Sequence, residues 1–411
     1  MLDHDNQRRH LLKLMAAAAL SACAPLTPNS KTQRVVVCGA GIIGASIAYH
    51  LAKSGAAVTV IDKEAPASHA SRATFAWINA TWAKQPQHYH NLNQQSVSHW
   101  HSIQKELGLP IRWQGSVEWF SSEQRQQKLE QQIAEQQLWG EAARMLTPEE
   151  LASMEPQLKV GSATRFAFSG NDGAINPVLA THALLNAAKA MGADVRYPCT
   201  LQETSVFNGR LQSVGTSCGE IKADKLVLAT GAATNAAKDF AGIDIPQRST
   251  PGIIGWTKPM PRLINRIIVA PGIHMHQRDD GRIVLGEQEG APKTGAHKQR
   301  LADRPNEFPV KAIAEEHGKR MLAIAKRFVP AIGQAEIEEV YIGWRPLPLD
   351  GHPVLGVSPN KPDVYLAIMH SGVSLAPVVG QLAANEITNE TAHSALGPYR
   401  PSREFAHLKR Y

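Results

Sequence analysis

The chain has 411 residues, of which 43% are hydrophobic and 19% are charged, so it can bury the cores of two domains. Its 43 Lys and Arg and 36 Asp and Glu give a net charge of +7. The basic residues are scattered along the chain, so the charge does not indicate a nucleic-acid partner. The four cysteines lack the spacing of metal ligands, so we expect neither a metal site nor a disulfide framework.

The N-terminal segment resembles an export signal that ends in a lipidation site. Arg8 and Arg9 precede an apolar stretch, Leu11 to Ala22, that is shorter than the ~20 residues of a membrane-spanning helix. The arginine pair, with the apolar residues and the lysine that follow, resembles the twin-arginine export motif, and Leu20 to Cys23 resembles a lipobox. We therefore expect an exported protein on the periplasmic side of the membrane, held there by a lipid on Cys23. The alternative is a cytoplasmic protein whose arginine pair is incidental.

A strand, a glycine-rich turn and a helix follow. The β-branched run Val35 to Val37 predicts the strand, and the residue pattern of Ala45 to Ser54 predicts the helix. In the turn between them, one glycine allows a sharp bend, the next lets the backbone approach a pyrophosphate, and the last lets the helix pack on the strand: Gly39, Gly41 and Gly44. This arrangement predicts a dinucleotide-binding site.

Two further features complete the predicted dinucleotide site. Free N–H groups at the start of the helix face the phosphates. A second strand, Val58 to Ile61, ends at Asp62, whose carboxylate is placed to bind ribose hydroxyls, with Lys63 beside it. An acid at this position disfavours NADP, whose ribose phosphate it would repel.

Four later segments favour FAD over NAD. They are the small-residue loop Ser71 to Thr74, the strand and Ala-Thr-Gly turn of Lys225 to Ala232, and two segments near the C-terminus, Gly343 to Gly356 and Ala367 to Ile387. Together with the glycine-rich turn, they resemble the D-amino acid oxidase, glycine oxidase and sarcosine oxidase family of FAD-dependent amine oxidoreductases. The resemblance runs from about Arg34 to about Glu390.

The resemblance implies an α/β fold in which a Rossmann-like FAD-binding domain is interleaved with an α+β substrate domain built on an antiparallel sheet. It also implies non-covalent FAD, because no cysteine follows Cys218, whereas some sarcosine oxidases attach FAD through a cysteine in the segment near Trp344. The expected boundaries are 1–33 for the signal and tether, 34–100, 161–242 and 339–395 for the FAD-binding domain, 101–160 and 243–338 for the substrate domain, and 396–411 for a C-terminal tail.

The resemblance also implies roles for individual residues. Arg345 would bind the substrate's carboxylate through two parallel N–H bonds, with an interdomain salt bridge as the alternative. A helix beginning near Leu375 would stabilise negative charge on the reduced flavin. His274 and His276 share one face of a predicted strand and are candidate pocket residues, as is Trp77. The expected cofactor contacts are Gly39, Gly41, Ile42, Ile43, Gly44, Asp62, Lys63, Ser71, Arg72, Ala73, Thr230, Gly231, Ser371, Gly372, Val373 and Ser374.

These assignments predict a FAD-dependent enzyme that oxidises the C–N bond of a small amine bearing a carboxylate: a D-amino acid, glycine or an N-methyl amino acid. Val284 stands where monomeric sarcosine oxidases carry a lysine that promotes oxygen reduction, so the electron acceptor is oxygen or a membrane acceptor. The alternatives are a hydroxy-acid dehydrogenase on the same fold and a non-catalytic FAD-binding electron-transfer subunit. Cys38, Cys199 and Cys218 are expected to serve packing alone.

Overall fold

The computed structural model covers the 411-residue chain, and we describe the folded unit from Gln33 onward by itself. The described residues are 32–81, 84–233, 235–287, 307–308 and 310–405. Arg8, Arg9 and Cys23 lie outside them, so the export signal and the lipidation site stay predictions. In the described part of the chain, no helix is long and apolar enough to cross a membrane.

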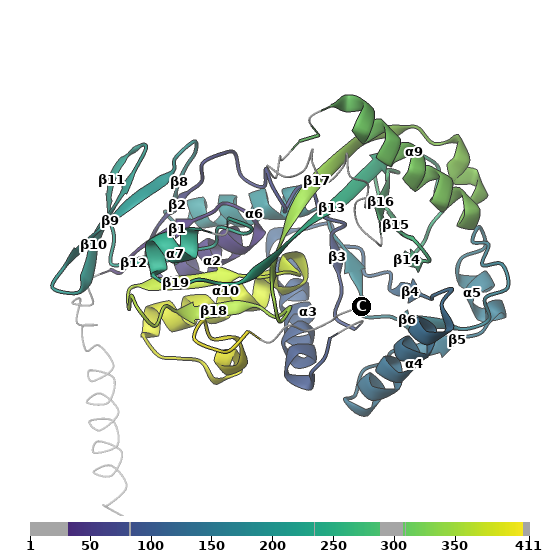
Figure 1. The fold of residues 1–411 in the computed structure, drawn as a ribbon, viewed down its shortest axis with the longest axis horizontal. Coiled ribbons are helices and arrows are strands. Elements are labelled where there is room, and N and C mark those ends of the chain that lie inside the picture. Colours follow the sequence, from purple (N-terminus) through teal and green to yellow (C-terminus); the bar gives the residue numbers. More distant parts are fainter. Residues whose placement is uncertain (1–31, 82–83, 234, 288–306, 309, 406–411) are drawn as a thin grey trace, which may run out of the picture. The chain divides into compact units, whose positions relative to one another are not determined.

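One sheet, with six strands among the described residues, forms a Rossmann-like core (Figure 1). Five of its strands run parallel, and β18 joins one edge antiparallel. In spatial order the strands are β18 (Val354–Val357), β19 (Val364–Ile368), β12 (Lys225–Leu228), β1 (Arg34–Cys38), β2 (Ala57–Ile61) and β8 (Asp194–Arg196). Strands far apart in the sequence therefore lie side by side, which is the signature of an interleaved domain.

Alternate side chains of β1 point into different layers, because successive residues of a strand face opposite sides of the sheet. Val35 and Val37 pack in one apolar cluster with the helices α2 (Ile42–Lys53), α3 (Gln87–Leu107), α6 (Pro177–Ala190) and α10 (Gly372–Asn389). Val36 packs in a second cluster with α7 (Ala236–Ala241) and with a three-stranded sheet of β9 (Leu201–Phe207), β10 (Arg210–Thr216) and β11 (Gly219–Lys222). All three valines are at most 1% exposed, so both faces of the sheet are covered.

A second sheet, with eight strands among the described residues, is antiparallel except between β14 and β4. Its order is β17 (Ile337–Pro348), β13 (Gln247–Thr257), β16 (Ile283–Glu287), β15 (Ile273–Gln277), β14 (Ile267–Ala270), β4 (Ser116–Glu118), β6 (Phe166–Ser169) and β5 (Arg144–Leu146). The fold class is therefore confirmed, while the exact domain boundaries stay predictions. Smaller elements are the pair β3 (Trp77–Ile78) and β7 (Gly173–Ala174), and the 3-10 helices η1 (Pro330–Gln334) and η2 (Ser394–Tyr399).

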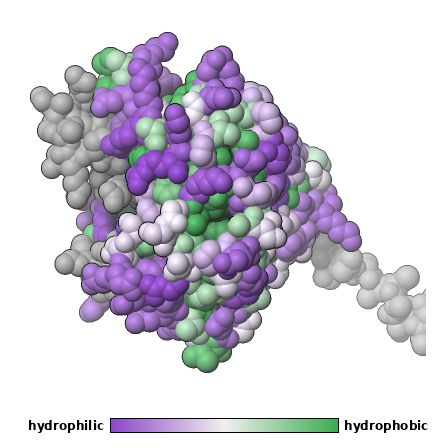
Figure 2. All heavy atoms as spheres, turned by 90° about the vertical axis from the view of Figure 1, so that its right-hand side faces the viewer, coloured by the Kyte–Doolittle hydropathy of each residue, from purple (hydrophilic) through white to green (hydrophobic). Residues whose placement is uncertain are grey.

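Amphipathic helices cover the second sheet. In α9 (Lys311–Phe328), Met321, Ala325 and Phe328 recur at helical spacing and pack on the sheet's apolar cluster. The other helices beside this sheet are α4 (Glu123–Leu138) and α5 (Pro148–Met154). On the face of the protein shown in Figure 2, hydrophilic side chains predominate and hydrophobic ones appear in patches between them.

Both helices next to the predicted cofactor begin three residues earlier than the sequence suggested. The helix expected from Ala45 begins at Ile42, directly after Gly41, and the helix expected near Leu375 begins at Gly372. Ser371 precedes the second helix with a positive φ of 63°, so the backbone turns sharply there. The N–H groups of Gly372 and Val373 therefore belong to the first turn of α10.

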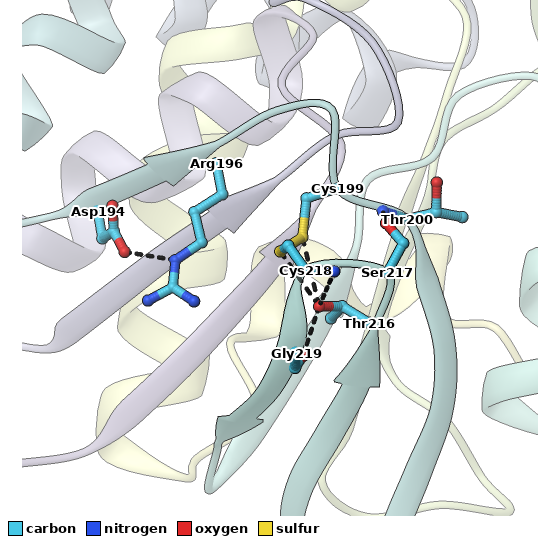
Figure 3. Close-up of a disulfide and its surroundings, with 8 residues drawn as sticks. All are labelled: Asp194, Arg196, Cys199, Thr200, Thr216, Ser217, Cys218 and Gly219. Atoms are coloured by element: carbon cyan, nitrogen blue, oxygen red, sulfur yellow. Dashed lines mark hydrogen bonds and ion pairs between the residues drawn. A yellow bond between two sulfur atoms is a disulfide. The ribbon is translucent and has the colours of Figure 1, made fainter.

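Cys199 and Cys218 form a disulfide, so the expectation that they serve packing alone was wrong (Figure 3). The bond joins the segment before β9 to the turn between β10 and β11, and the two Cα atoms lie 5.5 Å apart. The two cysteines meet because β9 and β10 pair antiparallel, with Leu201 opposite Thr216. Spacing along the sequence carried no sign of this contact, since it depends on the strand register.

We predict that the disulfide stabilises the fold. Replacing both cysteines, as Cys199→Ser with Cys218→Ser, lowers the free energy of unfolding by about 2–4 kcal/mol, because closing a loop restricts the unfolded chain. Thermal melts with and without a thiol reductant check this. The reductant should lower the melting temperature of the wild type and of a Cys38→Ser control, but not that of the double variant. A wild type that melts identically in both buffers would contradict the prediction.

Candidate functional site

A cavity is lined by residues of both large sheets. The six-stranded sheet and its helices contribute the starts of α2 and α10 and the segment after β12. The eight-stranded sheet contributes residues of β13, β15, β16 and β17. The loop between β2 and β3 supplies a further part of the lining, Ala70 to Ala76 with one gap at Arg72.

The glycine-rich turn is built so tightly that side chains would not fit. A Cβ on Gly39, whose φ is +113°, would lie 2.3 Å from the carbonyl oxygen of Ala229. A Cβ on Gly44 would lie 1.8 Å from the carbonyl oxygen of Gly39. Gly41 lines the cavity, and a Cβ there would lie 3.2 Å from Ser71 Oγ. Gly39 and Gly44 thus allow a sharp, closely packed turn, whereas the approach of Gly41 to a pyrophosphate stays a prediction.

Contacts around this turn hold its neighbours in place. The Ile42 N–H donates to Ser71 Oγ at 2.9 Å, which ties α2 to the loop between β2 and β3. The Asp62 carboxylate accepts hydrogen bonds from the N–H groups of Ala40 (2.7 Å) and Glu64 (3.0 Å). Ile43 and Ala73 also line the cavity, as predicted.

Six of the expected cofactor contacts are not among the residues that line the cavity: Gly39, Gly44, Asp62, Lys63, Arg72 and Thr230. The Lys63 side chain is 59% exposed, and its ammonium lies 3.7 Å from Glu64. The Arg72 guanidinium lies 4.1 Å from the centre of the Tyr341 ring. Its neighbours Ser71 and Ala73 line the cavity instead. Whether any of the six residues reaches a bound cofactor stays a prediction.

The segment after β12 and the start of α10 form a further part of the cavity wall. Gly231, Gly372, Val373 and Ser374 line the cavity, while Thr230 Oγ is buried without a hydrogen-bond partner among the described residues. Thr230 lies between two lining residues, Ala229 and Gly231, and Gly41 leaves space beside its backbone for a pyrophosphate. These observations fit FAD, which the starts of α2 and α10 would hold by their backbone N–H groups.

Arg345 lines the cavity from β17 and lies over a glycine of the neighbouring strand. A Cβ on Gly252 would lie 3.1 Å from Arg345 Nε and 3.3 Å from one terminal guanidinium nitrogen. The absence of a side chain at Gly252 therefore gives the guanidinium its space. A guanidinium on a cavity wall can bind a carboxylate through two parallel hydrogen bonds.

The two predicted histidines both pack against Phe75, with ring centres 5.4 Å (His274) and 4.9 Å (His276) from the centre of its ring. His274 lines the cavity, and burial followed by the charge of Arg345 lowers its pKa to about 4, so the imidazole is neutral at pH 7. His276 is buried, and its Nε2 lies 3.0 Å from the Phe75 carbonyl oxygen. Its pKa is lowered to about 3, chiefly by burial. The structure thus places His274 on the cavity, and His276 against Phe75.

The cavity residues that were not found from the sequence include three polar ones: Asn79, Lys84 and Glu287. Glu287 is buried, and its carboxylate lies 2.5 Å from Arg320 and 3.0 Å from His317. Trp77, a predicted candidate, lines the cavity, whereas Trp82 lies outside the described residues. The described residues contain no group of His, Cys, Asp and Glu suited to a metal ion.

Comparison with known proteins identifies the family. The family model "FAD dependent oxidoreductase" matches residues 34–386. The chain belongs to this family. It is an enzyme with FAD as its cofactor, as the sequence predicted, and its relatives act on amino acids.

Relatives cover nearly all of the chain. An opine oxidase subunit of Agrobacterium tumefaciens is 26% identical, over 87% of this chain and 95% of the relative. Glycine oxidase of Geobacillus kaustophilus is 25% identical, over 90% of this chain and 96% of the relative. The crystal structure of L-proline dehydrogenase from P. horikoshii matches with a TM-score of 0.79 at 25% identity, covering 90% of this chain and 97% of that one.

We predict that FAD binding depends on the close approach at Gly44. Gly44→Ala puts a methyl group into contact with the Gly39 carbonyl, so the turn must open. Overpacking of this kind costs about 1–3 kcal/mol, which corresponds to FAD binding weaker by roughly one to two powers of ten. Titration of the apoprotein with FAD measures this. Gly397→Ala, where a Cβ meets nothing within 4 Å, is the control. Equal affinity in Gly44→Ala and Gly397→Ala would refute the assignment.

Proposed function

We propose that this enzyme oxidises the C–N bond of a small amine that carries a carboxylate, such as a D-amino acid, glycine or an N-methyl amino acid. The observation that carries the proposal is the guanidinium of Arg345 on the wall of a cavity suited to FAD. Bound FAD accepts a hydride from the carbon next to the nitrogen. The chain's own residues then have to bind, orient and desolvate the substrate.

Arg345 and His274 suit the two polar groups of such a substrate. The guanidinium of Arg345 binds the carboxylate and so fixes both the distance and the direction of the molecule. His274 is neutral, so its imidazole can accept or donate a hydrogen bond to the amine without adding a charge. The positive charge of Arg345 also disfavours a protonated amine in the same cavity. A neutral amine has the lone pair that assists loss of a hydride from the adjacent carbon.

The rest of the wall is mainly apolar and would exclude water from the reacting carbon. Phe75 and Trp77 line the cavity, and their rings lie 5.4 Å and 6.4 Å from the His274 ring. Val284, which stands where sarcosine oxidases carry a lysine, is buried in an apolar cluster with Phe75. The electron acceptor under this proposal is oxygen or a membrane acceptor, and the rate of reoxidation in air separates the two.

We also propose that the enzyme is exported and held at the periplasmic side of the membrane. Three features support this: the pair Arg8 and Arg9, the apolar stretch that ends at Cys23, and the disulfide between Cys199 and Cys218. Disulfides persist in oxidising compartments and are rare in the reducing cytosol. The twin-arginine route carries folded proteins, so FAD could be bound before export.

For the substrate assignment, we predict that Arg345→Met lowers kcat/KM for an amino acid by about a hundredfold or more, since two hydrogen bonds to a charged group are lost. Arg345→Lys keeps the charge but cannot form two parallel hydrogen bonds, so its kcat/KM should lie between those of the wild type and Arg345→Met. Anaerobic stopped-flow with D-amino acids, glycine, N-methyl amino acids and hydroxy acids follows flavin bleaching.

Arg165→Met, which removes an exposed arginine paired with Glu123, is the matched control and should leave the rate unchanged. Unchanged efficiency in Arg345→Met would overturn the role of Arg345. Bleaching by hydroxy acids but by no amine would overturn the amine assignment.

For the export proposal, we predict that replacing Arg8 and Arg9 with lysines leaves the protein in the cytoplasm, because the twin-arginine route requires the pair. Cell fractionation locates the protein, and thiol labelling should find Cys199 and Cys218 oxidised in the exported wild type. Cys23→Ser tests the anchor separately, since it should release the exported protein from the membrane fraction. A variant with both lysines that is still exported would show that the pair has no role.

A further inference from the structure

A lysine that the sequence analysis did not single out is buried in the cavity wall. Lys84 is 5% exposed and lines the cavity. Its ammonium lies 5.4 Å from the centre of the ring of Tyr89, which is also buried. Burying an ammonium costs several kcal/mol unless other groups compensate its charge. Apolar packing alone therefore does not account for a lysine at this position.

The loop that leads to Lys84 is fixed to the start of α10. The Asn79 N–H donates to Ser374 Oγ at 3.0 Å, and Ser374 Oγ donates to the Trp77 carbonyl oxygen at 3.2 Å. Trp77, Asn79 and Ser374 line the cavity together with Lys84. The first turn of α10 and this loop thus form one connected stretch of the wall. A helix N-terminus carries a partial positive charge, so this stretch holds two positive groups.

A buried carboxyl group, that of Asp172, interacts electrostatically with the ammonium from within the protein. Asp172 is fully buried, and its oxygens accept hydrogen bonds from Ser116 Oγ, Trp77 Nε1 and the Ala80 N–H at 2.6–3.0 Å. Burial raises the pKa of this carboxyl, and attraction to Lys84 opposes the rise. Lys84 lines the cavity and Asp172 is not among its lining residues. Of these two groups, Lys84 is therefore the one that meets whatever occupies the cavity.

We propose that Lys84 stabilises the negative charge that the flavin gains when a substrate reduces it. A hydride brings two electrons and one proton, so the reduced ring system carries one additional negative charge, spread over N1 and the C2 carbonyl oxygen of its pyrimidine ring. The ammonium of Lys84 and the start of α10 act on this charge from one stretch of wall. Charges fixed in advance in a buried site need no reorganisation when the charge develops.

A second carboxylate on the substrate is the other anion that Lys84 could bind. The contacts favour the flavin, because the loop of Lys84 is bonded to the start of α10, whereas Arg345 and His274 lie on the eight-stranded sheet. The inference rests on FAD and is independent of which amine the enzyme oxidises.

The test is the reduction potential of the bound flavin, measured by equilibration with a reference dye under anaerobic conditions. Lys84→Met removes the charge and keeps a side chain of similar length. It should destabilise the reduced flavin relative to the oxidised flavin by at least about tenfold, which lowers the two-electron reduction potential by about 30 mV. Lys84→Arg keeps the charge and should keep a potential close to that of the wild type. Where Lys84→Met does not retain FAD, Lys84→Gln is measured in its place.

The matched control is Lys53→Met. The Lys53 ammonium also lies 5.4 Å from the centre of a tyrosine ring, that of Tyr49, but its side chain is 50% exposed and outside the cavity lining.

Sulfite affinity is a second readout, since the sulfite adduct places the same charge on the flavin. An unchanged potential in Lys84→Met would overturn the proposal, as would equal losses in Lys84→Met and Lys84→Arg. A selective rise in KM for dicarboxylate amines at unchanged potential would assign Lys84 to the substrate instead. If no amine reduces the wild-type flavin, the substrate assignment fails while this test stands.

Discussion

The ladder between β13 and β17 sets the geometry of the substrate side of the cavity. Gly252 pairs with Gly343, and Arg345 follows two residues later on the same face of β17. That register places the guanidinium diagonally across from a residue without a side chain, where long side chains of paired strands can reach. Gly343 in turn lets β17 approach the loop between β2 and β3, since a Cβ on Gly343 would lie 2.7 Å from Ala73. The pairing of β13 with β17 therefore fixes the position of Arg345 relative to the loop between β2 and β3.

Local features could be predicted from the sequence. The turn at Gly39, Gly41 and Gly44 depends on residues close together in the chain, and the structure shows why each lacks a side chain. The strand expected at Val35 to Val37 lies within β1, Arg34–Cys38. These signals are strong because backbone geometry and side-chain period act over a few residues.

Contacts between distant segments could not be predicted in the same way. The disulfide needs the register of β9 and β10, and the electrostatic interaction of Lys84 with Asp172 joins two segments far apart in the chain. His274 and His276 share a strand face and both pack against Phe75 from another segment, yet of the two only His274 lines the cavity. These contacts depend on how distant segments pack together, which short patterns in the sequence do not reveal.

The central claim is that Arg345 binds a carboxylate beside the flavin. Titration of the oxidised enzyme with a small carboxylate that cannot be oxidised, such as acetate or benzoate, tests it most directly, because a ligand beside the ring shifts the flavin absorbance. We predict a saturable shift in the wild type that Arg345→Met abolishes and Arg165→Met retains. A shift of equal affinity in Arg345→Met, or no shift at all in the wild type, would contradict the claim.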